Sequence, residues 1–310
     1  MHALLEVTLP VFIIIGAGYV SVLKKFFSPS DVNSLMAFAQ RFAIPCLLFN
    51  AISKLRLGEN FDAGIIASFY ISSTICFFLG ILGAILIFGR TKEDAICIGF
   101  AAFFGNTVLL GLSIVDRAYG QSSMPAAYLI AAIDAPYCYI LGITAMAIAQ
   151  KGGRSILENM RSIIVSVFRN SFMVAIFLGF AVNAANIELP RVLTDSLDMI
   201  SVAALPAALF ALGGILVEYK PEGDLKVISM VCLLSLVAHP ALAWLFSSQL
   251  LGLEHKIVRS ATVMSAMAPG VNAYIFANMY DRAKRVAASS VLIGTVLSIA
   301  TASVWLLVAG

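Results

Sequence analysis

The stretch SAMAPGVNAYIF, Ser265 to Phe276, lies inside an apolar run that is long enough to cross a membrane, yet it holds Pro269, Gly270 and Asn272 close together. Proline has no backbone N–H and clashes with the preceding turn, and glycine weakens a helix further. An uninterrupted spanning helix should avoid this combination. We therefore predict that the helix is broken here and that the break serves the function of the protein.

The composition predicts an all-α integral membrane protein. The chain has 310 residues, of which 61% are hydrophobic, and its mean hydropathy is +0.97, whereas soluble domains are roughly 45–50% apolar. The net charge of +3 is small, so we expect no nucleic-acid partner. The five cysteines lie in apolar runs without a C-x-x-C pair, and we interpret them as small hydrophobic residues rather than metal ligands or disulfides.

Ten apolar runs are candidate spans, because a spanning helix takes about 20 residues. The first lacks the basic leader and cleavage site of a signal peptide and is taken as a span. Ser28 to Val32, SPSDV, is typical of a helix start and precedes the second span. The predicted spans are 3–23, 32–53, 62–89, 94–117, 124–149, 168–187, 193–217, 225–250, 256–279 and 284–309.

The basic residues predict the orientation. Thirteen of the 20 Lys and Arg residues lie in the connections after the odd-numbered spans and six in the others, with Arg41 inside a span. Since cytoplasmic loops are enriched in Lys and Arg, both termini should face away from the cytoplasm. The longest connection, 151–167, should be a cytoplasmic linker that divides the chain into two sets of five spans.

Two halves with an odd number of spans each can repeat only with inverted topology. AIPCLLF at 43–49 and ALPAALF at 204–210 agree at four positions with an offset of 161, which Gly18 and Gly179 share. The same offset carries Val108 onto Pro269, so AFFGNTVLLG (102–111) of the fourth span falls opposite SAMAPGVNAY (265–274) of the ninth to within two residues. The two most polar and most glycine-broken span centres therefore occupy corresponding places.

These two breaks predict a binding site for a small anion. Gly105 weakens the fourth span, Asn106 and Thr107 are suited to cap a helix that restarts, and Asn272 can do so in the ninth. Unwound backbone is tolerated in a membrane only inside protein or beside a watery cavity. The N-terminal ends of two half-helices carry partial positive charge that suits an anion without a lysine. The alternative is a pair of proline or glycine kinks with satisfied polar groups.

Charged residues within spans are expensive and are candidates for function. Asp134, in LIAAIDAPYCYIL (129–141), is predicted to carry a proton or bind a cation; the alternative is a carboxyl group that bonds backbone freed by Pro136. Arg41 either snorkels to the cytoplasmic face, contacts an anionic substrate or reaches Asp134. His239 is a second candidate for proton coupling, although a histidine beside Pro240 is more often structural.

Three further residues have weaker assignments. Tyr274 follows Asn272 by two positions and is a candidate to line the site. Pro45 and Pro206 lie in the repeated segments and are candidates to shape the cavity, with a packing kink as the alternative.

Taken together, these motifs resemble the auxin efflux carrier family, whose bacterial members are malate or malonate permeases. The segments that carry the resemblance are spread over nearly the whole chain in family order: LPVFIIIGAGYV (9–20), FAIPCLLFNAI (42–52), GNTVLLGLSIV (105–115), ALPAALFALGGIL (204–216) and APGVNAYIFANMY (268–280).

The resemblance implies two inverted five-helix repeats, similar to the bile-acid/sodium symporter fold. Residues 1–57 and 168–222 would form a scaffold, and 58–150 and 223–310 a transport domain. The family's crossover positions map onto Asn106 and Thr107 and onto the run Pro269, Gly270, Val271 and Asn272. The bacterial inner membrane is the implied location. The long hydrophilic loop of the plant exporters is absent from this sequence.

We expect a secondary transporter of a small organic anion, a carboxylate such as a dicarboxylate or an auxin-like acid, working by alternating access. Its expected partners are that anion, membrane lipid and a second copy in a homodimer. We expect no cofactor, and proton or sodium coupling is left open. The alternatives are a bile-acid-type sodium symporter, a channel or sensor, and a membrane enzyme, for which the polar residues are too few and scattered.

Overall fold

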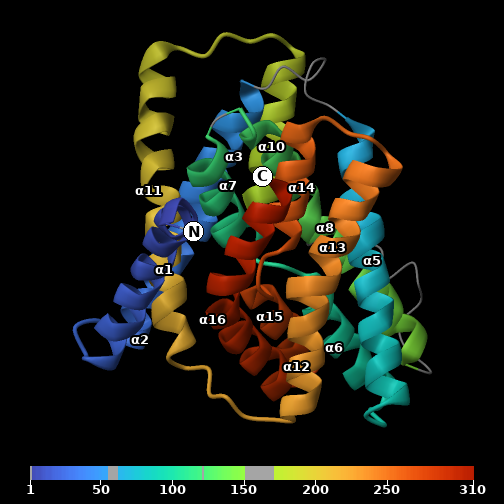
Figure 1. Cartoon of the computed structure of the whole chain (residues 1–310). Coiled ribbons are helices and arrows are strands. Elements are labelled where there is room, and N and C mark those ends of the chain that lie inside the picture. Colours follow the sequence, from blue (N-terminus) through green and yellow to red (C-terminus); the bar gives the residue numbers. More distant parts are fainter. Residues whose placement is uncertain (1, 55–61, 121, 151–170) are drawn as a thin grey trace. The chain divides into compact units, whose positions relative to one another are not determined.

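The computed structural model describes residues 2–54, 62–120, 122–150 and 171–310 (Figure 1). The chain divides into two compact units. The first unit comprises the described residues within 1–8, 62–163 and 219–310, and the second unit those within 9–61 and 164–218. The predicted linker 151–167 lies outside the described residues.

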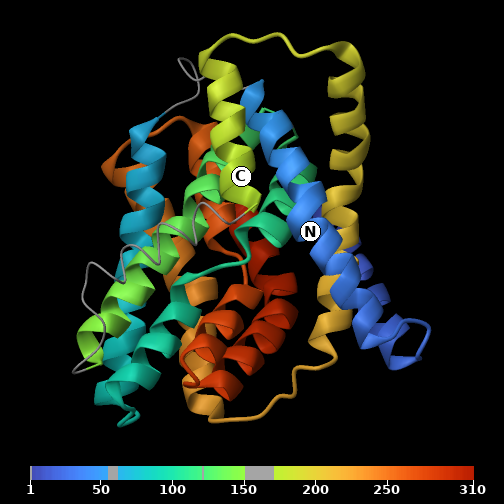
Figure 2. The ribbon, with the colours of Figure 1, turned by 180° about the vertical axis from the view of Figure 1, so that it is seen from behind.

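The first unit holds both predicted breaks. Apart from the first residues of helix α1, its elements are α5 (Ala63–Leu86), α6 (Lys92–Phe103), the π-helical turn η2 (Thr107–Gly111), α7 (Leu112–Tyr119), α8 (Met124–Ala149), α12 (Leu225–Leu233), the π-helical turn η3 (Leu234–Ala238), α13 (His239–Trp244), the π-helical turn η4 (Leu245–Leu250), α14 (His255–Ser265), α15 (Val271–Met279) and α16 (Lys284–Ala309). Helix α5 packs along α6 and α13, and α16 packs against α12, α14 and α15 (Figures 1 and 2).

The second unit is a smaller helical bundle. It contains most of α1 (His2–Leu23), with α2 (Pro29–Phe38), the π-helical turn η1 (Ala39–Ala43), α3 (Ile44–Ser53), α10 (Ser171–Ala184) and α11 (Arg191–Leu216). Helix α10 packs along α3, and α11 packs along both α2 and α3.

Among the described residues, seven helical segments are long and apolar enough to span a membrane: Glu6–Leu23, Pro29–Ser53, Ala63–Leu86, Met124–Ala149, Arg191–Leu216, Leu225–Leu250 and Lys284–Ala309. Ser171–Ala184 is apolar but shorter. The structure interrupts the predicted spans 94–117 and 256–279, which is why neither is counted as one continuous helix. The chain is therefore a helical, multi-pass membrane protein.

Polar residues begin several helices at the places where the loops end. Helix α2 begins at Pro29, as the SPSDV pattern predicts, and Ser28 caps it and forms a capping box with Asp31. Asp62, Thr91 and Asp224 accept hydrogen bonds from backbone N–H groups in the first turns of α5, α6 and α12. These side chains satisfy N–H groups that have no partner within the helix.

Small residues allow the helices of the second unit to approach closely. A Cβ added to Gly18 of α1 would collide with the Phe210 carbonyl oxygen of α11, and one added to Gly213 of α11 would collide with the Ile15 carbonyl oxygen. On another face of the unit, the Asn183 side-chain amide donates to the carbonyls of Ile52 and Ser53, both at 3.1 Å. Backbone contact between α1 and α11 is thus a condition of this packing.

We predict that Gly18→Ala lowers the free energy of unfolding, because overpacking against backbone typically costs about 1–3 kcal/mol. Gly16→Ala is the matched control: it lies two residues away in α1, and a Cβ there meets nothing within 4 Å among the described residues. Thermal unfolding in detergent measures both. Equal melting temperatures for the two variants would contradict the close contact.

Candidate functional site

Two interruptions lie within the first unit. Helix α6 ends at Phe103, and the chain is non-helical from Phe104 to Asn106 before η2 and α7 continue from Thr107. Helix α14 ends at Ser265, and Gly270 is in extended conformation (φ −78°, ψ 160°) before α15 begins at Val271. Each break therefore produces one helix C-terminus and one helix N-terminus.

The two breaks pair with each other through their backbones. Gly105 and Pro269 form an antiparallel β-bridge. The Asn106 N–H donates to the Ala268 carbonyl at 2.7 Å, and the Gly270 N–H donates to the Phe104 carbonyl at 2.9 Å. The unwound segments thus satisfy part of each other's hydrogen-bonding need, which hydrocarbon cannot do.

Proline and glycine fit this bridge for specific reasons. The cross-strand bonds come from the residues that flank Gly105 and Pro269, so the missing N–H of proline costs no bond across the bridge. A Cβ on Gly105 would lie 3.3 Å from the Met267 carbonyl oxygen, and one on Gly270 would lie 3.3 Å from the Gly105 carbonyl oxygen. The glycines thus leave room for two backbones to approach closely.

Neighbouring helices hold the ninth-span break in place. The Ser235 hydroxyl in η3 donates to the Met267 carbonyl at 3.1 Å. Gly294 of α16 faces the Pro269 ring, and a Cβ there would come within 2.7 Å of the ring Cδ. The rings of Phe100 in α6 and Phe276 in α15 stack at 3.8 Å with 3° between their planes, which joins the two broken helices near the bridge.

The kink in α12–α13 supplies a further anchor. Pro240 has no N–H to offer the Leu236 carbonyl, four residues before it. The indole N–H of Trp305 donates to that carbonyl at 2.8 Å instead. The π-helical turn η3 and this bond together place Ser235 against the break, a relation that the sequence analysis missed.

The helix N-termini after the breaks are not capped by the predicted side chains. Asn106 occupies the N-cap position of η2, but its side chain makes no capping hydrogen bond. Gly270 is the N-cap of α15, so Asn272 is its second residue and not its cap. The predictions that Asn106, Thr107 and Asn272 cap the half-helices are therefore wrong. First-turn N–H groups that have no intrahelical partner remain to be satisfied.

Asp134 connects α8 to the first of these helix N-termini. It is 2% exposed, and its Oδ2 accepts from the Thr107 hydroxyl at 2.7 Å. Its Oδ1 accepts from the Cys138 thiol at 3.5 Å. The bonds recorded for this carboxyl group are to side chains, so the alternative of a bond to backbone freed by Pro136 is not what the structure shows.

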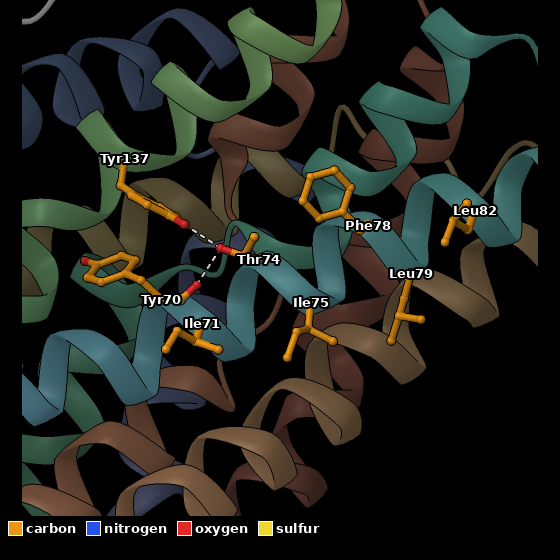
Figure 3. A pocket seen from close by; sticks show the side chains of 8 residues that line it. All are labelled: Tyr70, Ile71, Thr74, Ile75, Phe78, Leu79, Leu82 and Tyr137. Carbon is orange, nitrogen blue, oxygen red and sulfur yellow. Dashed lines mark hydrogen bonds between the residues drawn. The ribbon is translucent and has the colours of Figure 1, made fainter. Parts of the chain in front are cut away.

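A groove of about 500 Å³ runs along α5, with Tyr137 of α8 also in its lining (Figure 3). The Tyr70 hydroxyl donates to the Ile130 carbonyl at 2.8 Å, and the Thr74 hydroxyl bonds the Tyr70 carbonyl and the Tyr137 hydroxyl. The other lining residues are apolar: Ile71, Ile75, Phe78, Leu79 and Leu82. The hydroxyl groups of Tyr70, Thr74 and Tyr137 are hydrogen-bonded to one another or to backbone carbonyls. The groove therefore offers few free hydrogen-bond donors to an anion.

His239 is buried at the start of α13, with 2% of its surface exposed. Its ring lies edge-on to Phe69, with 5.0 Å between centroids. Its Nε2 has no hydrogen-bond partner among the described residues. The structure thus places His239 one turn beyond Ser235, on the same kinked segment that contacts the break.

The remaining candidates are dispersed. Tyr274 is half-buried in α15, with its ring 5.1 Å from that of Tyr219. Arg41, Pro45 and Pro206 all belong to the second unit. Arg41 is exposed in η1, Pro45 is buried directly after η1, and Pro206 is exposed within the uninterrupted α11. The structure therefore groups Gly105, Asn106, Thr107, Pro269, Gly270, Val271 and Asn272 at the breaks, with Asp134 beside them.

Gly294→Ala should loosen the backbone pairing, because the added methyl group pushes against the Pro269 ring. We predict faster hydrogen exchange at the Asn106 and Gly270 amides, measured by mass spectrometry on peptides that cover the breaks. Thr301→Ala is the control, since this exposed hydroxyl on α16 bonds its own helix at Leu297. Unchanged protection in Gly294→Ala would show that α16 does not hold the break.

Comparisons with known proteins relate the chain to membrane transport proteins. Residues 3–306 match the family described as membrane transport protein. The chain is 24% identical over 301 residues to a putative malonate transporter of Rhizobium meliloti, covering 97% of this chain and 94% of that protein. It is 22% identical over 308 residues to the uncharacterized transporter YfdV of Escherichia coli K12 (97% and 96% covered). It is 23% identical over 312 residues to the uncharacterized transporter MJ1031 of Methanocaldococcus jannaschii (97% of each).

Proposed function

Because this chain belongs to the membrane transport protein family, the auxin efflux carrier-like family that its motifs resemble, we propose that it is a secondary transporter of a small organic anion. The substrate is a carboxylate, such as a dicarboxylate or an auxin-like acid, and it is held at the paired breaks. The observation that carries this proposal is the backbone bridge between Gly105 and Pro269, which brings two uncapped helix N-termini into one unit.

The proposed architecture has ten spans in two inverted five-helix repeats. In it the first unit is the transport domain, and the second is the scaffold against which it moves by alternating access. Three findings support this reading: the division of the chain into two units, the presence of both breaks in the first, and the 161-residue offset that relates the breaks in sequence.

Simple energetics make such a site adequate for transport. A hydrogen bond to a charged group contributes about 1.5–3 kcal/mol, and a helix N-terminus adds about 0.3–1 kcal/mol or more. Three or four N–H donors from η2 and α15 would therefore supply roughly 5–10 kcal/mol before the cost of ordering the ligand. Dissociation constants from millimolar to micromolar correspond to about 4–8 kcal/mol, a range that binds an anion and still releases it.

The location, partners and coupling belong to the same proposal. We propose the bacterial inner membrane, with both termini on the non-cytoplasmic side because of the excess of Lys and Arg in the opposite loops. A homodimer through the second unit would keep the scaffold still. A proton or a sodium ion is the proposed coupling ion.

Counterflow in proteoliposomes tests the function directly. Malonate leads the carboxylate panel because one relative is named a putative malonate transporter. Vesicles loaded with unlabelled anion should accumulate the labelled anion transiently, with saturation, since a carrier exchanges ligand across one site. A linear, unsaturable flux would indicate a channel, and chemical conversion without translocation would indicate an enzyme.

Asn106→Ala and Asn272→Ala should each weaken substrate binding at least tenfold while leaving the melting temperature within a few degrees. The reason is that both side chains lie at the breaks without a capping role. Asn278→Ala is the matched control, because Asn278 is exposed on the same helix as Asn272. Calorimetric or scintillation-proximity titration measures the affinities. Wild-type affinity in both break variants would place the substrate elsewhere.

Arg41→Gln separates two roles for an exposed arginine in a spanning segment. If Arg41 contacts the anion during the cycle, the variant should raise the KM for uptake tenfold or more, and Arg41→Lys should recover part of the loss by restoring the charge. A snorkelling arginine predicts a KM close to that of the unmodified protein in both variants.

A further inference from the structure

Asp134 is joined to the crossover by a single hydroxyl group. Thr107, whose hydroxyl donates to Asp134 at 2.7 Å, is the first residue of η2 and directly follows Asn106. The Asn106 N–H donates one of the two backbone hydrogen bonds that pair the breaks. The carboxyl group of α8 thus acts on the same helix N-terminus that is proposed to hold the anion, and the inference below rests on that proposed function.

Asp134 has no basic partner among the described residues. The groups that interact with it are Thr107 of η2, Cys138 of its own helix and Tyr70 of α5. Helices α6, α7 and α14 also pack against α8. Their titratable residues, none of which interacts with Asp134, are Lys92, Glu93, Asp94, Cys97, Asp116, Arg117, Tyr119, His255, Lys256 and Arg259.

A threonine hydroxyl has one proton to donate and two lone pairs that accept. The Thr107 Oγ1 and Asp134 Oδ2 oxygens lie 2.7 Å apart. When Asp134 is ionised, the Thr107 hydroxyl donates to the carboxylate and cannot donate to a second anion. When Asp134 is protonated, its carboxyl O–H can donate to the Thr107 oxygen. The Thr107 proton is then free to turn toward an anion at the start of η2.

We propose that Asp134 binds the coupling proton and that Thr107 transmits its protonation to the substrate anion, so that proton and anion bind together. In this step a hydronium ion from solution loses one O–H bond, an O–H bond forms on the Asp134 carboxyl, and a water molecule is left. Protonation also removes a negative charge next to the site. The result is symport of one proton with each anion.

Thermodynamic linkage fixes the sign of the pH dependence. If protonated Asp134 favours the anion, the bound anion favours protonated Asp134 to the same extent. Raising the pH above the titration midpoint should therefore weaken anion binding by about tenfold per pH unit, because one proton must be taken up for each anion bound. Binding should also take up a proton from a weakly buffered solution.

The main experiment measures malonate binding to the full-length protein in nanodiscs as a function of pH, with a pH dye to report proton uptake. Asp134→Asn keeps the side chain at position 134 uncharged at every pH. The affinity of this variant for malonate should equal that of the wild-type protein at low pH and should no longer fall as the pH rises. This variant also corrects for titration of malonate itself. Thr107→Val should uncouple the two events, whereas Thr107→Ser, which retains the hydroxyl, should keep the pH dependence. Ser113→Ala is the control, since it removes a buried hydroxyl that donates to its own helix at Leu109.

A second measurement needs no substrate. Infrared difference titration should show a protonated-carboxyl C=O band that appears on acidification and is absent in Asp134→Asn. Thr107→Val should shift this band because its hydrogen-bond partner is removed, and Thr107→Ser should leave it in place. Absence of such a band in the wild-type protein would overturn the inference whichever anion is the substrate.

The outcomes distinguish the inference from the function on which it rests. Malonate binding without proton uptake, or an unchanged pH dependence in Asp134→Asn, would refute the proton role and leave the anion transporter intact. Binding that requires sodium and is lost in Asp134→Asn would replace the proton by a sodium ion and also refute it. Failure of the whole carboxylate panel in counterflow, with the Asp134 band present, would refute the proposed substrate class.

Discussion

The backbone bridge between Gly105 and Pro269 is the interaction on which the first unit depends. A peptide group inside a membrane must find its hydrogen-bond partner within the protein, because hydrocarbon offers none. An interrupted helix is therefore permitted only if something else pairs with the unwound backbone. In this protein each interruption supplies partners to the other, through the Asn106 and Gly270 amides. Neither break is explained alone, since each needs the other for the pairing.

The surrounding helices show how such a bridge is supported. Pro240 frees the Leu236 carbonyl, Trp305 binds it, and the kinked segment places Ser235 on the Met267 carbonyl. Gly294 lets α16 approach the Pro269 ring. At Pro240 the proline removes a backbone donor, and the indole of another helix replaces it. The kink in the eighth span thus positions the Ser235 hydroxyl to bond the backbone at the break in the ninth span.

The same region brings Asp134 next to one of the two breaks. First-turn N–H groups of η2 and α15 have no partner within their own helices, and Thr107 lies within hydrogen-bonding distance of Asp134. The groove along α5 is mostly apolar, and its three polar residues are bonded to one another or to backbone (Figure 3). The proposed function therefore places the anion at the helix ends and not in this groove.

Local chemistry in the sequence determined the helical, multi-pass character of the chain, the family and the places where helices stop, because hydropathy, Pro and Gly act on their own neighbourhood. The start of α2 at Ser28–Asp31 was readable for the same reason. The predicted caps were wrong, because a polar side chain can bond a distant residue instead of the first turn of its own helix. Thr107 bonds Asp134, 27 residues away, and the N-cap residue of α15 is Gly270. The bridge, the Ser235 and Trp305 bonds and the close approach of Gly18 to Phe210 likewise join residues far apart in the chain. Only the tertiary structure decided these contacts, because the repeat offset relates the two breaks in sequence but does not specify which atoms bond across them or which other helices touch.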